Sequence, residues 1–435
     1  MKLPTFLMVG FLLSALVRGG EMPRVEPAAV GLSPQLAEKV SEALQRLVDD
    51  RKIPGAVVAV ARRGRVAVLT AVGLRDRERG DPMTEDTIFA IASMTKPVTC
   101  VAAMTLVERG QIGLDDPVAR FLPELGDPRV LEPSRPGESE DLVTVPARRP
   151  ITVRDLLTHT SGYTYGGLLT PDFRLTRLYA EAKVQDRGLE TIAEQVARLG
   201  RVPLAHHPGE RWTYGLSHDV LGRLIEVVSG MSFDRYLEEA ICQPLDLRDT
   251  SFHVPESKRH RMATIYRGGT APELSPLPRT FGSTTFFAGG GGLFSTARDY
   301  LRFAQMLLNG GELEGVRILR PETVAAMTSN QIGDQWALGQ KYGLGLGLEF
   351  EPDPAAGKPV VSRFFWGGFF STRFWAEPRN ELVGVYLTQV LPTDHGAGSV
   401  LIRKLVSEAV EDRGTRPNQD GGDPGAGEDA AEGAR

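Results

Sequence analysis

Apolar residues near the start of the chain recur at the spacing of an amphipathic helix. Ser33 and Pro34 form a helix-start signal, and Pro54-Gly55 ends the segment. Between these signals, one helical face carries the apolar side chains Leu36, Ala37, Val40, Leu44, Leu47 and Val48. Two runs rich in β-branched residues follow, over 56–61 and 66–72. Arg62-Arg63-Gly64 joins them, which predicts a β-hairpin.

The middle of the chain is helical in pattern, and the last third is extended. Helical spacing of apolar residues occurs in four segments: 98–107, 153–157, 218–229 and 233–241. Strand patterns occur in four others: 343–350, 363–365, 371–376 and 382–390. A closing helix is expected over 399–411, with Leu401, Leu405 and Val406 on its inner face. The pattern predicts an α+β unit, in which strands from both chain ends form one antiparallel sheet around a helical insertion.

The first nineteen residues have the layout of a secretory signal peptide. Lys2 precedes a mostly apolar run over 3–17, and Arg18 and the small residue Gly19 follow it. About fifteen apolar residues are too few to cross a bilayer, so no integral membrane span is expected in the mature chain. The structural alternative is a poorly ordered extension. Cleavage predicts a periplasmic or secreted protein, and an uncleaved leader predicts a cytoplasmic one.

Composition and charge narrow the possible functions. The 435 residues carry a net charge of −5 and a pI of about 5.9, so they predict no basic surface for nucleic acid. Residues 413–435 contain no large apolar side chain, which predicts a disordered tail after a domain over 25–410. Four prolines within 131–150 predict a loop. Cys100 and Cys242 are too few for a disulfide framework or a cysteine-rich metal site, and whether they pair stays open.

Ser93-Met94-Thr95-Lys96 is the first segment that carries chemistry. A spacing of three places Ser93 and Lys96 on one helical face, within reach of each other. A neighbouring lysine activates a serine if burial or nearby cations lower the pKa of the lysine. Backbone N–H groups at a helix N-terminus also stabilise developing negative charge. The structural alternative is Ser93 as a helix cap with Lys96 exposed to solvent.

Two further motifs follow in chain order. Tyr214 lies in the stretch 211–217, directly before a helix that Ser217 is placed to cap. Its phenol would project into a cleft or pack in the core. The second motif is Trp366-Gly367-Gly368, where a strand ending in two glycines allows a substrate or another backbone to approach closely. A strand edge with an ordinary bend is the alternative.

The order of these three motifs resembles the serine β-lactamase-like superfamily, and most of all the class C β-lactamase-related (family VIII) carboxylesterases. The resemblance spans roughly residues 25–410 and includes further stretches, at 151–162, Pro244-Leu245 with Asp249-Thr250, and 289–296. It implies a β-lactamase/transpeptidase-like α+β fold with two lobes: an α/β lobe over about 25–92 and 285–410, and a mainly helical lobe over about 93–284.

The resemblance also implies a set of site residues. Ser93 would be the nucleophile that forms an acyl-enzyme, and Lys96 and Tyr214 would act as general acid and base. The backbone N–H groups of Ser93 and Phe369 would form the oxyanion hole. The implied substrate-binding residues are Leu216, Trp366, Gly367 and Gly368. Neither a metal nor another cofactor is implied.

Two departures from class C β-lactamases favour esters. Trp366 stands where those enzymes carry the lysine of Lys-Thr-Gly, so the charge that helps hold the β-lactam carboxylate is missing. Leu216 stands where they carry the asparagine of Tyr-x-Asn. The leading hypothesis is a carboxylesterase with a small-molecule ester as its substrate. A β-lactamase, a D-amino peptide hydrolase and an acyltransferase would use the same site, and a non-catalytic ligand-binding protein of the same fold is the alternative from another class.

Other candidate side chains are interpreted as structural. His159 follows a short helix that Thr152 caps together with Asp155, and Cys100 is expected in the core. Thr296, after a run of four glycines, is expected to cap a helix rather than to close a phosphate loop. Because strands alternate faces, roughly half of one aromatic group is expected to line a pocket: Phe364, Phe365, Phe369, Phe370, Phe374 and Trp375.

Overall fold

The computed structural model describes most of the chain between residues 20 and 412. The described ranges are 20–132, 142–167, 172–185, 191–268, 274–391 and 397–412. The predicted signal peptide, 1–19, and the predicted tail, 413–435, lie outside them, as does 133–141 within the predicted loop.

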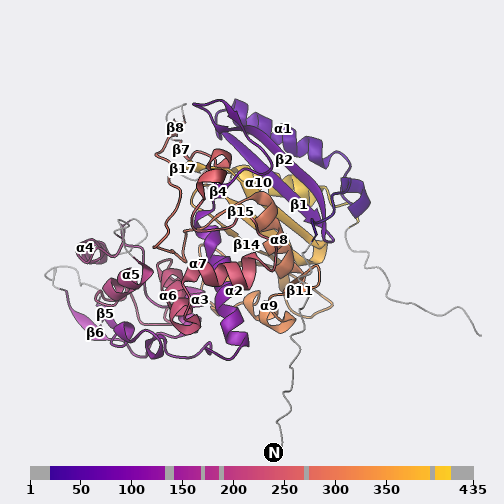
Figure 1. Cartoon of the computed structure of the whole chain (residues 1–435). Helices are drawn as coiled ribbons and strands as arrows, with labels where there is room; N and C mark the ends of the chain where they lie inside the picture. The colour runs from indigo at the N-terminus through magenta and orange to yellow at the C-terminus, as the bar shows by residue number, and fades with distance from the viewer. Residues whose placement is uncertain are drawn as a thin grey trace, which may run out of the picture.

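A large antiparallel sheet is the centre of the fold, and it combines strands from both ends of the chain (Figure 1). Its strands are β1 (Gly55–Arg62), β2 (Arg65–Asp76), β3 (Asp81–Pro82), β12 (Lys341–Tyr342), β13 (Gly347–Glu351), β14 (Val360–Gly367), β15 (Arg373–Glu377) and β16 (Leu382–Leu387). Their order across the sheet is β12-β13-β14-β15-β16-β1-β2-β3. The two chain ends meet where β1 pairs with β16, with Val57 opposite Leu387. The predicted α+β architecture is confirmed.

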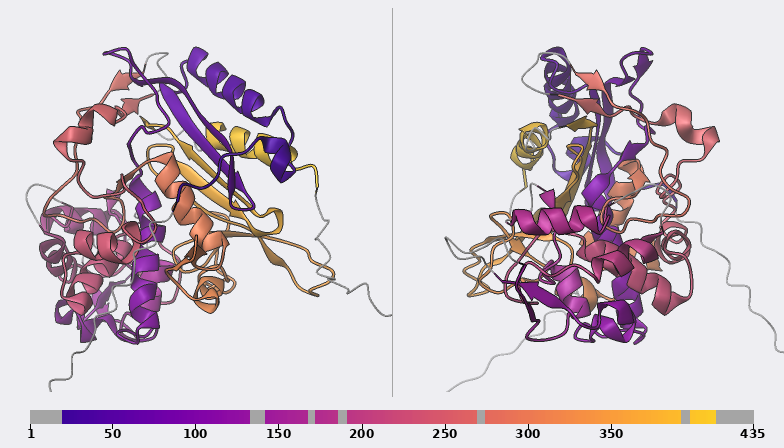
Figure 2. Two further views of the ribbon diagram at one scale, coloured as in Figure 1. Left: turned by 45° about the vertical axis from the view of Figure 1, so that its right-hand side comes forward. Right: turned by 90° about the vertical axis from the view of Figure 1, so that its left-hand side faces the viewer.

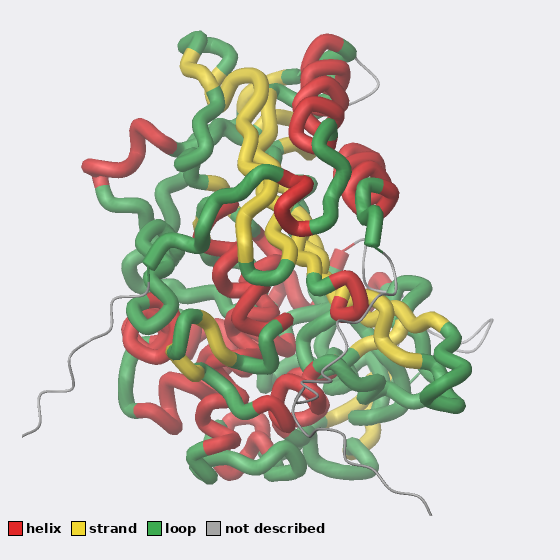
Figure 3. Tube along the Cα trace, turned by 90° about the vertical axis from the view of Figure 1, so that its right-hand side faces the viewer, coloured by secondary structure: helices red, strands yellow, loops and turns green. Residues whose placement is uncertain are grey.

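Helices cover both faces of this sheet. α1 (Leu36–Asp49) and α10 (Ala397–Glu408) lie on one face, and α8 (Ala297–Leu308) lies on the other (Figure 2). The longer strands occupy one half of the molecule, and helices and loops predominate in the other half (Figure 3). The remaining α-helices are α2 (Thr95–Glu108), α3 (Val153–Thr158), α4 (Phe173–Glu181), α5 (Ile192–Leu199), α6 (Ser217–Ser229), α7 (Phe233–Leu237) and α9 (Pro321–Met327).

Two hydrophobic cores lie on the two faces of the sheet, and β1 separates them. Val57 and Ala59 belong to the core that extends through α8 to the helical half. Val58 and Val60 belong to the core beneath α1 and α10. Because both of its faces are covered, every residue of β1 is buried. This burial explains why β1 is a continuous apolar run in the sequence rather than an alternating one.

Short strands connect the two halves. β4 (Phe89–Ala90) pairs with β9 (Phe294–Ser295), which brings the segment before Ser93 close to the glycine run 289–292. β5 (Arg129–Leu131) and β6 (Thr144–Pro146) also pair, so the segment predicted as a loop contains part of a two-stranded sheet. The other short strands are β7 (Tyr266–Arg267), β8 (Ser275–Pro276), β10 (Glu312–Leu313), β11 (Val316–Arg317) and β17 (Val390–Leu391).

The helices begin near the predicted residues, but two of the predicted N-terminal caps are wrong. Thr152 and Asp155 form the predicted reciprocal capping box of α3. Ser33 does not cap α1, because the helix begins three residues later, at Leu36. Ser217 does not cap α6 either: it is already helical, and its hydroxyl lies 2.9 Å from the hydroxyl of Ser161.

The strands lie close to their predicted positions but differ in length. Arg63 and Gly64 join β1 to β2 with left-handed φ angles of 52° and 70°, as a tight two-residue hairpin requires. The strand predicted over 343–350 begins only at Gly347, because residues 343–346 form the turn between β12 and β13. Leu401 is exposed on α10 and Ile402 is buried instead, so the predicted inner face of this helix was wrong at that position.

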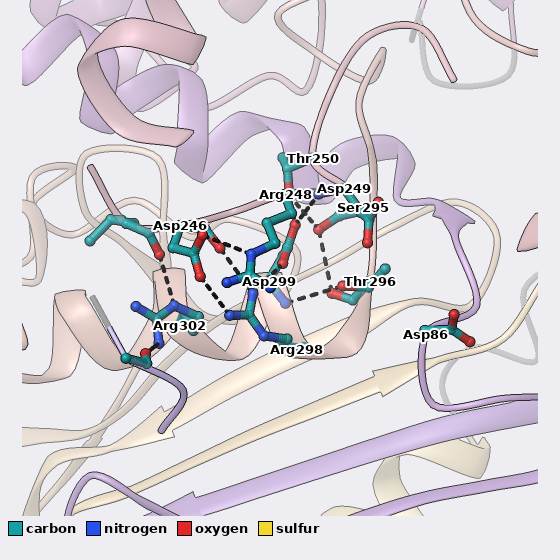
Figure 4. A network of polar contacts seen from close by, with 12 residues as sticks. Asp86, Asp246, Arg248, Asp249, Thr250, Ser295, Thr296, Arg298, Asp299 and Arg302 are labelled. Carbon is teal, nitrogen blue, oxygen red and sulfur yellow. Dashed lines mark hydrogen bonds and ion pairs between the residues drawn. The ribbon is translucent and has the colours of Figure 1, made fainter. Parts of the chain in front are cut away.

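A buried polar network holds the start of α8 (Figure 4). Thr296 caps the helix as predicted, by accepting a hydrogen bond from the N–H of Asp299. The carboxylate of Asp299 accepts the N–H of Asp249 at 2.7 Å and the hydroxyl of Thr250 at 3.1 Å. Thr250 also contacts the hydroxyl of Ser295 at 2.8 Å. The network therefore ties Asp249 and Thr250, which follow the π-helical turn Glu238–Cys242, to β9 and the start of α8.

Candidate active site

Ser93 lies in a strained turn at the start of a buried helix. It is the middle residue of the 3₁₀ turn Ala92–Met94, which leads directly into α2. Ala92 has a φ of 45°, a left-handed conformation that costs a residue with a side chain about 1 kcal/mol or more. The turn places the backbone N–H of Ser93 at the positive end of the helix dipole.

Lys96 is completely buried and faces Ser93 across one helical turn. Its Nζ lies 3.1 Å from Oγ of Ser93, as the spacing of three predicts. The ammonium also donates to the carbonyl of Gly290 at 2.6 Å and to the phenol oxygen of Tyr165 at 3.0 Å. It lies 4.6 Å from the centre of the Tyr214 ring. The structure thus brings Ser93, Lys96 and Tyr214 together from distant parts of the chain.

The surroundings of Lys96 keep its side chain positively charged. Burial lowers the pKa of Lys96, but the phenols of Tyr165 and Tyr214 raise it, and the net pKa lies above that of an ordinary lysine. The expectation of a lowered pKa is therefore wrong, because phenol and carbonyl oxygens rather than cations face the ammonium. Lys96 is a fixed positive charge next to the serine hydroxyl.

Tyr165 is a site residue that the motifs did not identify. Burial raises the pKa of Tyr165, although Lys96 acts in the opposite direction, so its phenol stays protonated at neutral pH. Its ring centre lies 5.3 Å from that of Tyr214, and the two phenols stand on the same side of the ammonium. A tyrosine-rich stretch after Ser161-Gly162 is the only signal in the sequence, and no chain spacing relates it to Lys96.

The glycine run supplies a backbone carbonyl to the site. The carbonyl of Gly290 accepts the lysine hydrogen bond, and its N–H donates to Oδ1 of Asp219 at 2.9 Å. The carbonyl of Gly289 accepts the hydroxyl of Thr99 on α2 at 2.8 Å. A Cβ on Gly289 would lie 2.2 Å from the carbonyl of His218, so only glycine allows this approach of the loop to α6.

A cleft of about 330 Å³ opens beside Ser93. Ser93 and Tyr214 line one side, and the end of β14 lines the other with Trp366, Gly367 and Gly368. The indole of Trp366 packs 5.9 Å from the ring of Tyr214, measured between ring centres. The three sequence motifs therefore meet at one cleft.

Gly368 brings the end of β14 close to the segment before Ser93. A Cβ at this position would lie 2.1 Å from Oγ1 of Thr372 and 2.3 Å from the carbonyl of Ile91. The N–H of Gly368 donates to the carbonyl of Thr372 at 2.8 Å and is therefore used within the fold. The next backbone N–H along the chain is that of Phe369, the residue that the resemblance implies for the oxyanion hole. The side chain of Phe369 is 61% exposed and lines the cleft.

Leu216 does not lie where the resemblance implied. Its side chain is 2% exposed and belongs to the core of the helical half. The chain turns at Gly215 into α6, and an apolar side chain at this turn packs inward. Leu216 therefore has a structural position rather than the expected substrate contact.

The aromatic residues around β14 and β15 divide between the cleft and the cores. Phe365 and Phe369 line the cleft. Phe364 and Phe374 lie in the core on one face of the sheet, and Trp375 lies in the core on the other. This division follows the alternation of side chains along a strand.

Two neutral histidines lie beneath the tyrosines. The ring of His159 packs 4.4 Å from that of His218 and 4.9 Å from that of Tyr214. His218 Nε2 lies 3.1 Å from Sγ of Cys100, and both cysteines of the chain are free, buried thiols. Burial lowers the pKa of both histidines well below the usual value, and the charge of Lys96 lowers it further.

These histidines predict a loss of stability in acid. Above pH about 6.5 they are neutral in both the folded and the unfolded chain, so they leave the free energy of unfolding unchanged. Below that pH only the unfolded chain takes up the protons, and stability should fall by up to about 1.4 kcal/mol per pH unit for each histidine. Denaturant unfolding between pH 7 and pH 5 measures this slope. His159→Gln should make it shallower, whereas the exposed His260→Gln should match the wild type; equal slopes in all three proteins would contradict the assignment.

Other site types have no support in the described part of the chain. No helix within the described ranges is long and apolar enough to cross a membrane. Among the same residues, no cluster of three or more histidine, cysteine or acidic side chains could hold a metal ion. Both ring nitrogens of His206 are used within the fold, one by the Thr213 hydroxyl at 2.8 Å and the other by the His207 carbonyl at 2.9 Å.

The fold and this site define a class of enzyme: a serine hydrolase with a β-lactamase/transpeptidase-like fold. The sequence model of the family described as Beta-lactamase matches residues 40–407. The chain belongs to this family, and the resemblance seen in the three motifs is confirmed.

Three relatives illustrate the family around this chain. Protein Rv1367c of Mycobacterium tuberculosis is 36% identical over 365 residues, which cover 80% of this chain and 89% of that protein. Esterase EstB of Burkholderia gladioli is 32% identical over 378 residues, which cover 81% and 90%. The solved structure of EstCE1, described as a hydrolase with promiscuous acyltransferase activity, is 29% identical with a TM-score of 0.71, covering 87% of this chain and 99% of that one.

Proposed function

We propose that this protein is a carboxylesterase that cleaves small-molecule esters through an acyl-enzyme on Ser93. The observation that carries the proposal is the buried Nζ of Lys96 at 3.1 Å from the Ser93 hydroxyl, next to a cleft where Trp366 replaces the lysine expected for β-lactam binding. The similarity to Esterase EstB supports an ester as the substrate, and the similarity to EstCE1 supports a hydrolase.

The chemistry divides between the lysine and the tyrosines. The Lys96 ammonium donates to Oγ of Ser93 and stabilises the negative charge that forms there during attack on the ester carbonyl. A charged lysine cannot accept the serine proton, so in this proposal Tyr214, which lines the cleft, acts as a phenolate: it accepts the serine proton, becomes a phenol and returns the proton to the departing alcohol. Tyr165 stays protonated and accepts a hydrogen bond that holds Lys96 in place.

The acyl carbonyl oxygen needs its own stabilisation when the tetrahedral intermediate forms. In this proposal the backbone N–H groups of Ser93, at the start of α2, and of Phe369, after β14, donate to that oxygen. Collapse of the intermediate breaks the ester C–O bond and leaves the acyl group on Ser93. A water molecule then attacks the acyl-enzyme, its proton passes to Tyr214 and on to Oγ, and the carboxylic acid is released.

Acyl transfer is the second candidate function. The solved structure of EstCE1 is described as having promiscuous acyltransferase activity, and an alcohol would attack the same acyl-enzyme in place of water. β-Lactam hydrolysis and D-amino peptide hydrolysis are less favoured, because Trp366 stands where class C β-lactamases carry the lysine of Lys-Thr-Gly. A non-catalytic ligand-binding protein would not need the Ser93–Lys96 contact.

A substrate panel tests the proposal. The purified chain should hydrolyse p-nitrophenyl butyrate and neighbouring acyl lengths, and it should cleave nitrocefin far more slowly. Addition of an alcohol acceptor, followed by product analysis, separates hydrolysis from acyl transfer. Turnover of nitrocefin without turnover of any ester would contradict the assignment as an esterase.

A further inference from the structure

A single charged side chain lines the cleft among the residues that the structure describes there, and it is Arg373 on β15. Ser93 and Tyr214 line the same cleft. The remaining described lining is uncharged, and its other polar side chains are Gln340, Ser371, Thr372 and Ser399. An ammonium or guanidinium that faces a substrate cleft is a recognition element for an anionic group.

The register of the sheet explains how the guanidinium reaches the cleft. Arg373 lies directly opposite Gly367 in the pairing of β15 with β14, and opposed residues share one face of a sheet. A Cβ on Gly367 would lie 3.5 Å from Nε and 3.6 Å from an Nη atom of Arg373. The guanidinium therefore lies within van der Waals distance of where a Cβ at residue 367 would stand, at the end of β14 that lines the cleft.

Two guanidinium groups lie near the ring of Phe365. The Arg373 guanidinium lies 5.8 Å from the centre of the Phe365 ring, and that of Arg363 lies 5.1 Å from the same ring. Arg403 lies one helical turn after Ser399 on α10, and burial and repulsion from Arg363 lower its pKa. Glu349 pairs with Arg363, so Arg373 is the charged group of this set that lines the cleft.

We propose that Arg373 binds a carboxylate carried by the ester substrate, so that the preferred substrates are esters with a second, anionic group. This inference rests on the proposed function and names its substrate class. β14 ends at Gly367, and Phe369, whose N–H belongs to the oxyanion hole of the proposed reaction, lies two residues further along the chain. The bound carboxylate would therefore lie several bonds from the scissile ester. An arginine has five N–H donors, and a carboxylate ligand would share them with the partners that Arg373 already has in the fold.

Two matched pairs of esters test the proposal on the purified full chain. Monophenyl adipate and phenyl hexanoate differ by a carboxylate on the acyl side. 4-(Butanoyloxy)benzoate and its methyl ester differ by a carboxylate on the alcohol side. For at least one pair, kcat/KM should be about fivefold to tenfold higher for the anionic member. Arg373→Gln should remove that preference, and Arg373→Lys should keep part of it.

A matched control separates a specific contact from the general charge of the protein. Arg379 is exposed on the turn between β15 and β16, outside the cleft, and Arg379→Gln changes the net charge by the same amount. It should retain the preference. Equal rates within both pairs in the wild type, or a preference that survives Arg373→Gln, would overturn the proposal.

Failure of the subsite and failure of the esterase proposal give different results. If the neutral esters are hydrolysed in a Ser93-dependent manner and the anionic preference is absent, only the role of Arg373 is excluded. If none of the four esters turns over, calorimetry on Ser93→Ala decides the binding question. Monophenyl adipate or 4-(butanoyloxy)benzoate should bind that variant more tightly than its neutral partner, and Arg373→Gln in the same background should abolish the difference; equal binding would overturn the proposal.

Discussion

Replacement of Ser93 by alanine should lower kcat/KM for p-nitrophenyl butyrate by about 10⁴-fold or more. The hydroxyl is the nucleophile in the proposed reaction, and its neighbours cannot replace it, because Lys96 carries no free electron pair when charged. Steady-state kinetics measures the loss. Intact-mass spectrometry after treatment with a fluorophosphonate gives a second measurement, since the wild type should gain one adduct and Ser93→Ala none.

A second serine provides the control for this variant. Ser257 is exposed, and Ser257→Ala should keep both the activity and the adduct. A stable, folded Ser93→Ala protein that retains the wild-type rate would rule out Ser93 as the nucleophile. A wild-type chain that gains no adduct and hydrolyses no ester would favour the non-catalytic alternative.

Replacement of Lys96 by methionine should lower kcat by about 10²–10³-fold with a smaller change in KM. Methionine keeps most of the length of the side chain but removes the positive charge next to Oγ. The labelling of Ser93 by the fluorophosphonate should slow by a similar factor and still reach completion, because the nucleophile is present. The fold should survive, although the carbonyl of Gly290 loses its partner.

The pH dependence distinguishes a charged lysine from a neutral one. Because the pKa of Lys96 is raised, its side chain should stay charged up to pH 9. The acylation rate should therefore show no increase below pH 9 that is caused by deprotonation of Lys96. Tyr165→Phe, which removes one of the acceptors of the ammonium, should reduce kcat by about tenfold. Lys39→Met on the exposed face of α1 should have no effect. A wild-type rate in Lys96→Met would contradict the proposed role.

Contacts between close neighbours in the chain were predictable from the sequence. Helix geometry places residues three apart on one face, and Ser93 and Lys96 meet at 3.1 Å as expected. The capping box of Thr152 and Asp155 and the hairpin turn at Arg63-Gly64 follow from similarly local rules. In each case, a few backbone dihedral angles determine the contact.

Positions at the ends of elements were harder to predict. Leu216 and Ser217 lie where a turn becomes a helix, and a shift of one residue decides whether a side chain faces the cleft, the core or the helix cap. The structure buries Leu216 and makes Ser217 the first helical residue. Leu401 differed from its prediction for another reason: it lies within α10, and the helix turns its neighbour Ile402 inward instead.

The sequence by itself determined the α+β architecture, the family and the order of the three motifs, because apolar periodicity and short spacings are local properties. Only the tertiary structure decided the protonation of Lys96 and the place of Arg373. The pKa of Lys96 depends on Tyr165 and Tyr214, which packing brings within a few ångströms of it. Arg373 reaches the cleft because the register of β15 against β14 places it opposite Gly367. Electrostatic interactions depend on distance in space, and the spacing of residues along a chain does not determine that distance.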